Sequence, residues 1–189
     1  MFILFALFIL PNIIASDEEK DFRTTMLELH NLHRGYRNEC NLTIYGYPII
    51  PSEEILKPLE WDKDLEEDAK KWAKRCINET KKLKGKRVGK WELVGQNIDL
   101  TTELYEALNR WADGAEFYNH KRNKCNNTEL CNKYKRIVQS NTTHVGCAHH
   151  QCENFPERKT NIVVCNYAPS STEDRPYVDG RKGRCKLNN

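Results

Sequence analysis

One segment, residues 131–168, constrains the fold of this chain more than any other. It holds four of the eight cysteines: Cys131, Cys147, Cys152 and Cys165. Two β-rich runs, at 144–148 and 161–168, lie on either side of the sequence ENFPERKT, in which proline and charged residues interrupt both helical and strand periodicity. The segment therefore predicts a central β-hairpin that disulfides tie to itself and to another part of the chain.

The first 15 residues, MFILFALFILPNIIA, carry no charged side chain, and the polar sequence SDEEK follows at once. The apolar run is too short to cross a bilayer and is typical of a secretory signal peptide, which we expect to be cleaved near Ala15 or Ser16. A retained anchor is the alternative interpretation. No other apolar run approaches the length of a membrane span, so we expect a secreted protein without stable membrane insertion.

Cysteines and glycosylation motifs support the same compartment. Eight cysteines in an exported chain predict four disulfides rather than metal thiolates. The N-x-[ST] motif occurs at Asn41, Asn78, Asn126 and Asn141. We expect two or more of these asparagines, but not all, to carry a glycan. The length of 189 residues suits one domain, and the formal net charge of +3 is too small to indicate a nucleic-acid partner.

Apolar periodicity divides the chain into helices followed by strands. Residues 21–38 and 62–78 carry apolar stripes at helical spacing, and a third stripe follows Thr101 and Thr102, either of which can cap its helix. Helices that precede strands predict an α+β fold, in which the helices cover a small antiparallel sheet. The remaining expected elements are a strand entry at 93–100, a polar loop at 119–131 and a short helix at 134–139.

Several motifs occur in an order and spacing that resemble a known family. They are HNLHR at 30–34, LEWDKDLEEDAKKWAKRC at 59–76, VGQNI at 94–98, Trp111 with Tyr118, HVGCAHHQC at 144–152 and VVCNYAPSS at 163–171. They resemble the CAP superfamily of cysteine-rich secretory proteins, venom antigens and plant pathogenesis-related proteins. Within it, the chain is most similar to the secreted venom-allergen-like proteins of parasitic worms.

The resemblance implies an α-β-α sandwich, with a three-stranded antiparallel sheet between helical layers. This CAP domain would cover residues 16–169, and residues 170–189 would form a short C-terminal extension tied by a disulfide. The sequence alone does not choose among the possible disulfide connectivities. The pairings that the resemblance implies are Cys147–Cys165, Cys76–Cys152 and Cys125–Cys131, which leaves Cys40–Cys185.

Many members of this family hold a divalent metal in a cleft with two histidines and two glutamates. The resemblance places these four positions at Thr80, Gln96, Gly114 and Lys133. None of them supplies the family's ligand: the amide oxygen of Gln96 is a poor neutral ligand for a transition metal, and Lys133 would put a cation where a cation binds. We therefore expect no metal, no other cofactor and no metal-assisted hydrolysis.

Other catalytic or metal-binding sets are weaker. Three histidines lie near Cys147 and Cys152 and raise the possibility of zinc: His144, His149 and His150. Both cysteines are expected to form disulfides, however, and adjacent residues of a strand face opposite sides. We expect His30 to be a packing residue rather than a base. Ser140 and Ser170 lack a motif that places a base beside them, so a nucleophilic enzyme is not supported.

The first functional hypothesis is lipid binding. The resemblance implies a groove between the first and fourth helices that can hold a fatty acid, and we assign its lining to Met26, Leu29 and Ile137. The alternative is that these three residues belong to the core. Sterol is a weaker ligand, because the loop at 117–134 carries aromatic residues only near its two ends. In this hypothesis the protein is a secreted, non-catalytic lipid-binding CAP protein that acts in host interaction or immune modulation.

The second hypothesis is a secreted protein that binds a host protein or a glycosaminoglycan and carries no lipid. A basic loop offers a possible polyanion patch: Lys81, Lys82, Lys84, Lys86 and Arg87. Binding there would fall with salt, and the alternative is an ordinary solvated loop. A second basic cluster comprises Arg181, Lys182, Arg184 and Lys186. Pairing of Cys185 with Cys40 would hold this cluster near the end of the first helix.

Overall fold

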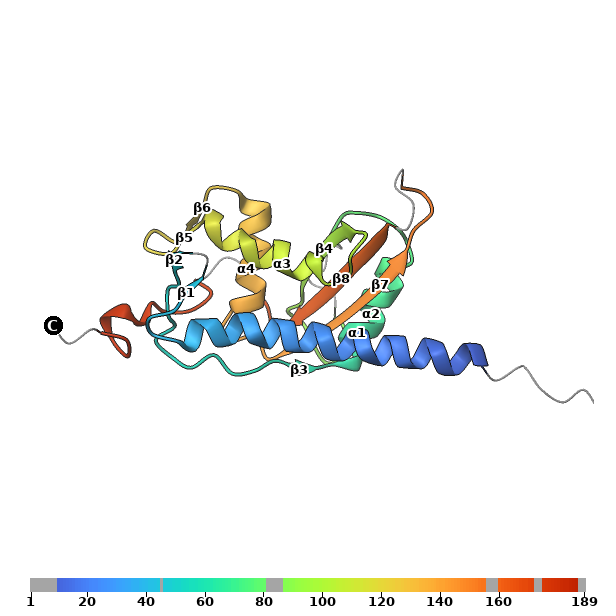
Figure 1. The fold of residues 1–189 in the computed structure, drawn as a ribbon, viewed down its shortest axis with the longest axis horizontal. Coiled ribbons are helices and arrows are strands. Elements are labelled where there is room, and N and C mark those ends of the chain that lie inside the picture. The colour runs from blue at the N-terminus through green and yellow to red at the C-terminus, as the bar shows by residue number, and fades with distance from the viewer. Residues whose placement is uncertain (1–9, 45, 81–86, 156–159, 172–174, 187–189) are drawn as a thin grey trace, which may run out of the picture.

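The predicted hairpin forms the centre of the main sheet. The computed structural model describes residues 10–44, 46–80, 87–155, 160–171 and 175–186, with only the backbone of 10–20. In it, β7 (His144–Gln151) pairs antiparallel with β8 (Asn161–Ala168), and Cys147 lies opposite Cys165. On the other side of β8, β4 (Gly95–Thr101) adds a third antiparallel strand (Figure 1).

The main sheet has four strands rather than the three that the resemblance implied. A two-residue strand, β3 (Glu60–Trp61), pairs parallel with β7, so that the order is β3-β7-β8-β4. The extra strand arises because the chain runs along β7 just before it enters α2. There the Glu60 amide donates to the Thr143 carbonyl at 2.9 Å, and the Asp62 amide donates to the Val145 carbonyl at 2.9 Å.

Alternate residues of β8 face two different cores, which confirms the predicted α-β-α sandwich. Val163, Cys165 and Tyr167 pack with α1, α3 and α4 on one face of the sheet. Ile162 and Val164 pack with α2 on the other face. This alternation follows from the two-residue repeat of a strand, and β8 is buried because helices cover both faces.

The first helix, α1 (Leu10–Gly35), starts earlier than the predicted range of 21–38 and runs along the length of the molecule (Figure 1). A 3₁₀ turn, η1 (Tyr36–Asn38), continues it. The helix includes the predicted cleavage point near Ala15, whereas residues 1–9 of the predicted signal peptide lie outside the described residues. Within the described part of the chain, no helix has the length and apolar character needed to cross a membrane.

The second helix, α2 (Lys63–Ala73), is shorter than the predicted range of 62–78. Asp62 caps its start, since its Oδ1 accepts hydrogen bonds from the amides of Asp64 and Leu65. The helix ends at Ala73, and the backbone leaves the helical direction at Cys76, which has a φ of 52°.

The predicted cap of the third helix is wrong. The Thr101 hydroxyl accepts a hydrogen bond from the Glu103 amide and donates to the Glu103 carbonyl, so it stabilises a turn before α3 (Glu106–Asp113). The second candidate, Thr102, also lies ahead of that turn. The 3₁₀ turn η2 (Gly114–Phe117) follows the helix.

The polar segment predicted as a loop contains a small hairpin and the start of a helix. Strands β5 (Tyr118–Asn119) and β6 (Lys124–Cys125) pair antiparallel. Helix α4 (Thr128–Val138) begins well before the predicted 134–139, because the side chain of Asn127 accepts a hydrogen bond from the Leu130 amide and caps it.

Four disulfides join distant parts of this fold. They are Cys40–Cys185, Cys76–Cys152, Cys125–Cys131 and Cys147–Cys165, the pairing that the resemblance implied. Cys40–Cys185 holds the C-terminal segment, with its 3₁₀ turn η3 (Gly180–Lys182), against the end of α1. The short hairpin of β1 (Thr43–Ile44) and β2 (Tyr47–Pro48) lies at the same end of the molecule (Figure 1).

Candidate functional site

A cleft of about 460 Å³ lies at the β4 edge of the main sheet. Its lining comes from the segment that follows α2, from β4 and from α4: Asn78, Glu79, Thr80, Ile98, Glu129, Asn132, Lys133 and Arg136. Thr80 and Lys133 are two of the four positions at which the resemblance placed metal ligands. We call this hollow the sheet-edge cleft.

The residues at the four metal positions do not fit a divalent cation. Gln96 is buried, and its Nε2 donates to the Asn166 side chain at 2.9 Å, on the α2 side of the sheet. Gly114 lies so close to α4 that an added Cβ would collide with the Leu130 carbonyl oxygen. Thr80 offers only a hydroxyl and Lys133 a positive charge. The donor set is therefore unsuitable for a transition metal or for Mg²⁺.

Lys133 is the first of two cations in the lining of the cleft, and it is buried. Its side chain is 10% exposed, and its Nζ lies 2.9 Å from the Glu129 carboxylate one helical turn earlier. The Glu129 side chain is 78% exposed, so water screens this pair. Exposed pairs of this spacing contribute about 0.3–0.5 kcal/mol, and the cost of separating this one is correspondingly small.

Arg136, one turn further along α4, is the second cation, and its side chain is partly buried. Its Nη1 donates to Asn97 Oδ1 at 3.1 Å, whereas its Nε is buried without a hydrogen-bond partner. No carboxylate among the described residues forms an ion pair with Arg136. Burial lowers the pKa of this guanidinium below its ordinary value, yet an arginine stays charged in a protein. The cleft therefore contains a cation whose charge the surrounding residues leave largely uncompensated.

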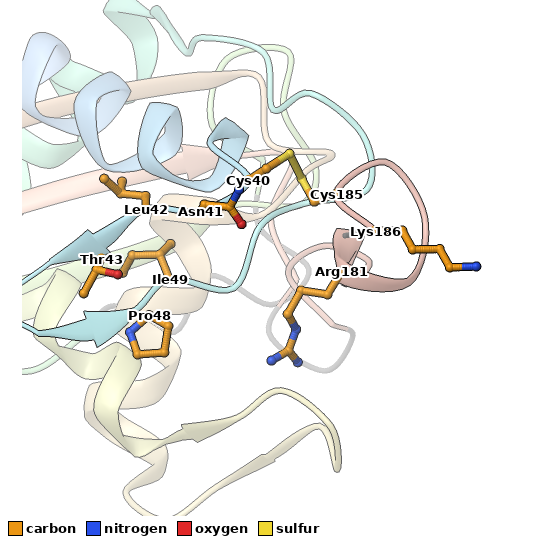
Figure 2. Close-up of a pocket in the computed structure, with 9 residues that line it drawn as sticks. All are labelled: Cys40, Asn41, Leu42, Thr43, Pro48, Ile49, Arg181, Cys185 and Lys186. Carbon is orange, nitrogen blue, oxygen red and sulfur yellow. A yellow bond between two sulfur atoms is a disulfide. The ribbon is translucent and has the colours of Figure 1, made fainter. Parts of the chain in front are cut away.

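A second hollow, of about 480 Å³, lies beside the Cys40–Cys185 disulfide (Figure 2). Asn41, Arg181 and Lys186 belong to its lining. Arg181 is neutralised by Asp179, whose Oδ1 accepts from Arg181 Nε at 2.9 Å; this hydrogen bond lowers the pKa of Asp179 and raises the pKa of Arg181. This hollow therefore has a weaker claim to bind an anion than the sheet-edge cleft.

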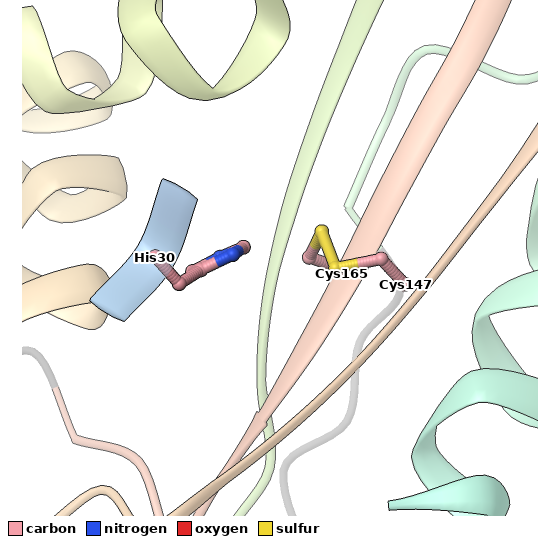
Figure 3. Close-up of side chains that lie close together, drawn as sticks. All are labelled: His30, Cys147 and Cys165. Carbon is pink, nitrogen blue, oxygen red and sulfur yellow. A yellow bond between two sulfur atoms is a disulfide. The ribbon is translucent and has the colours of Figure 1, made fainter. Parts of the chain in front are cut away.

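His30, Cys147 and Cys165 are the one group among the described residues whose side chains bring three metal-ligand atoms within 4.8 Å of one another (Figure 3). The two cysteines form a disulfide and cannot act as thiolates. Both ring nitrogens of His30 also have partners, Nδ1 at 2.6 Å from the Met26 carbonyl and Nε2 at 2.9 Å from the Tyr167 hydroxyl. His30 is thus a packed core residue, and the group does not form a metal site.

The other three histidines of the proposed zinc alternative are separated by the sheet and its neighbours. His149 packs on Phe22 of α1, with ring centroids 4.6 Å apart. His144 packs on Trp91, with ring centroids 4.8 Å apart. His150 lies next to His149 in β7 and so points to the opposite face. The side chains therefore do not converge on one ion.

The three residues assigned to a lipid groove lie in or beside the core between α1 and α4. Met26 and Ile137 are fully buried, and Leu29 is partly buried against them. None of the three lines either of the two hollows described above. A lipid between α1 and α4 would therefore require these helices to move apart.

The structure describes one residue of the predicted basic patch. Arg87 is exposed and forms an ion pair with Glu92. Lys81, Lys82, Lys84 and Lys86 lie outside the described residues.

All four predicted glycosylation sites are exposed: Asn41, Asn78, Asn126 and Asn141. Asn41 and Asn78 each border one of the two hollows.

This α-β-α sandwich, with four disulfides and a cleft at the sheet edge, defines a disulfide-stabilised CAP-type domain. The model of the cysteine-rich secretory protein family, CAP, matches residues 27–167, and the chain belongs to this family. The Schistosoma mansoni venom allergen-like protein 4 has a similar structure, with a TM-score of 0.72 and 31% identity, over 85% of this chain and 97% of that one.

Two vertebrate proteins are similar in sequence. Human GLIPR1-like protein 1 is 31% identical over 183 residues, which cover 92% of this chain and 69% of that protein. Mouse peptidase inhibitor 16 is 27% identical over 90% of this chain. The chain spans only 32% of the length of that relative, so the match concerns its CAP region.

Proposed function

We propose that this protein is a secreted CAP protein that acts by binding and does not catalyse hydrolysis. The observation that carries the proposal is the pair of cations, Lys133 and Arg136, in the cleft where the family resemblance places a metal site. Metal-assisted hydrolysis needs a cation that polarises a substrate or activates water. A site built around two positive side chains repels such a cation and attracts negatively charged ligands instead.

The Ser170 hydroxyl does not have the surroundings of an activated nucleophile. The Ser170 hydroxyl is buried without a hydrogen-bond partner, so no base within this part of the structure is placed to take its proton. His30 is occupied on both ring nitrogens, and burial lowers its pKa to about 4. Both observations support binding over covalent catalysis.

The proposal is tested by measuring metal affinity and turnover on the purified full chain. We expect no saturable binding of Zn²⁺ or Mg²⁺ in calorimetry and no hydrolysis of ester or peptide substrates, with or without a chelator. The triple variant T80H/Q96E/K133H supplies three of the family's ligands and serves as the positive control for zinc. Turnover by the wild-type chain that one point mutation removes would refute the proposal.

A lipid ligand remains a second candidate, and the surface of α1 favours it. Leu29 is only partly buried, and Leu32, three residues later on the same helix, is 47% exposed. These side chains form an apolar edge at which a fatty acid could enter between α1 and α4 and thereby contribute to host interaction or immune modulation. Native mass spectrometry after delipidation tests this: uptake of palmitate or cholesterol with fixed stoichiometry supports it, and an unchanged apo mass rejects it.

A further inference from the structure

We propose that the sheet-edge cleft is an oxyanion site, in which Lys133 and Arg136 bind a phosphate or sulfate group of a ligand. The inference deepens and rests on the proposed function, since it names the chemistry that the cleft recognises. It depends on three features of the described residues: an unpaired donor, a weakly held cation and a rim of neutral polar groups.

Arg136 supplies the unpaired donor. A guanidinium has five N–H groups, and the only hydrogen bond that Arg136 makes in the described residues runs from Nη1 to Asn97. Its Nε is buried beside Gly95, which does not line the cleft, whereas its Nη2 makes no hydrogen bond among the described residues. Buried charges in proteins are normally paired, because leaving one unpaired costs more than the pair returns. An oxyanion in the cleft supplies an acceptor for Nη2 and the missing counter-charge.

Lys133 supplies the weakly held cation. Its partner Glu129 is solvent-exposed, whereas Lys133 itself is largely buried at the cleft wall. An anion that enters the cleft can therefore replace the Glu129 carboxylate at the Lys133 ammonium, while the carboxylate returns to water. Phosphate and sulfate suit this pair because arginine and lysine both recognise them through charge-assisted hydrogen bonds.

The rest of the lining can complete such a site. Thr80 and Asn132 offer neutral donors from the two sides of the cleft. Glu79 also lines the cleft, but it is exposed and water screens it, as it screens Glu129. Both acidic residues are exposed, whereas Lys133 is buried and Arg136 is partly buried, so we expect the inner part of the cleft to favour an anion.

The test is a ³¹P NMR titration of the full chain with inorganic phosphate in a low-salt chloride buffer. We expect Lys133→Gln to weaken phosphate binding by about tenfold or more, as the loss of a charge-assisted hydrogen bond predicts. Glu129→Gln removes the competing carboxylate and should strengthen binding. Lys124→Gln changes the net charge by the same amount as Lys133→Gln, but Lys124 is an exposed residue on β6 outside the cleft and should leave the affinity unchanged.

Two further arms separate the sources of the anion. A sulfated heparin disaccharide that competes with phosphate identifies a glycan ligand, whereas competition by vesicles containing phosphatidic acid, but not by phosphatidylcholine vesicles, identifies a lipid headgroup. If neither the disaccharide nor the vesicles compete with phosphate, the ligand is a free oxyanion. Equal affinities of the wild type and Lys133→Gln, or no gain in Glu129→Gln, would overturn the proposal. Both results concern phosphate affinity and not turnover. Failure of the anion site can therefore be distinguished from failure of the proposal that the protein does not catalyse hydrolysis.

Discussion

The imidazole of His30 on α1 lies 2.9 Å from the hydroxyl of Tyr167 on β8. The His30 Nδ1 lies against the Met26 carbonyl, which can only accept, so Nδ1 carries the proton and Nε2 accepts from the tyrosine. Tyr167 in turn accepts from Asn97 on β4, whose side-chain oxygen accepts from Arg136 on α4. One continuous series of hydrogen bonds thus joins the core to the wall of the sheet-edge cleft.

This arrangement predicts an acid-sensitive fold. Burial lowers the pKa of His30 from 6.5 to about 4, so below pH 6.5 the unfolded chain binds a proton that the folded chain excludes. Stability is therefore complete above pH 6.5 and falls as the pH drops toward 4, by roughly 3 kcal/mol from this residue. Urea unfolding between pH 7.5 and 4.5 measures the effect.

The matched control for that measurement is His30→Gln, which cannot titrate. Burial also lowers the pKa of His33 and of His120, so the variant keeps their share of the pH dependence. The difference between the two curves of unfolding free energy against pH gives the contribution of His30. Parallel curves for the wild type and the variant would show that His30 does not titrate as described.

Arg34→Met should strongly destabilise the protein. The buried guanidinium of Arg34 donates to four backbone carbonyls, those of Lys57, Ile137, Gln139 and Thr142. Methionine fills the space but leaves these acceptors unpaired, so we expect a loss of about 3 kcal/mol or more in the free energy of unfolding. Arg122→Met, at an exposed arginine, should change it by less than about 0.5 kcal/mol in the same denaturant titration.

Gly114→Ala should destabilise the fold by about 1–3 kcal/mol, because the new methyl group meets the Leu130 carbonyl oxygen of α4. Gly35→Ala is the matched control: nothing lies within 4 Å of its added Cβ, and its φ of −55° suits alanine. That variant should stabilise the fold by about 0.4–1 kcal/mol. Thermal unfolding of both variants checks the prediction, and a tolerated Gly114→Ala would show that η2 and α4 are less tightly packed.

A glycan on Asn78 would stand at the rim of the sheet-edge cleft, since Asn78, Glu79 and Thr80 all line it. We therefore expect Asn78→Gln to lower the mass by one glycan and to increase the affinity for a bulky sulfated saccharide. Asn126→Gln, at an exposed sequon outside the cleft, should change the mass alone. Intact-mass spectrometry with a saccharide titration distinguishes these results, and equal affinities would show that Asn78 carries no obstructing glycan.

Features that depend on local pattern were predictable from the sequence. The central hairpin followed from β-rich runs around a breaker, the α+β class from helices that precede strands, and the sandwich from the family resemblance. The strand β3 was missed because it spans two residues and depends on backbone hydrogen bonds alone, which carry no side-chain signature. The start of α4 was missed because its first turn is polar and its cap, Asn127, lies in a stretch that resembles a loop.

The candidate site also contains one residue that the sequence could predict and one that it could not. Lys133 was recognisable from its place in a family motif, since the motif fixes which position faces the cleft. Arg136 was not, because nothing in its local sequence indicates that tertiary packing against β4 buries its Nε and leaves that atom without a partner. The hydrogen bonding of the Arg136 side chain depends on residues some 40 positions away, such as Asn97.

The Cys40–Cys185 disulfide spans 145 positions and encloses the main sheet and helices α2, α3 and α4 in one covalent ring. A protease that cuts the backbone once anywhere inside this ring leaves two pieces that remain bonded to each other. A nicked molecule therefore migrates as a single species until a reductant is added. In surroundings rich in proteases, such a molecule can lose the continuity of its backbone without losing any part of its surface.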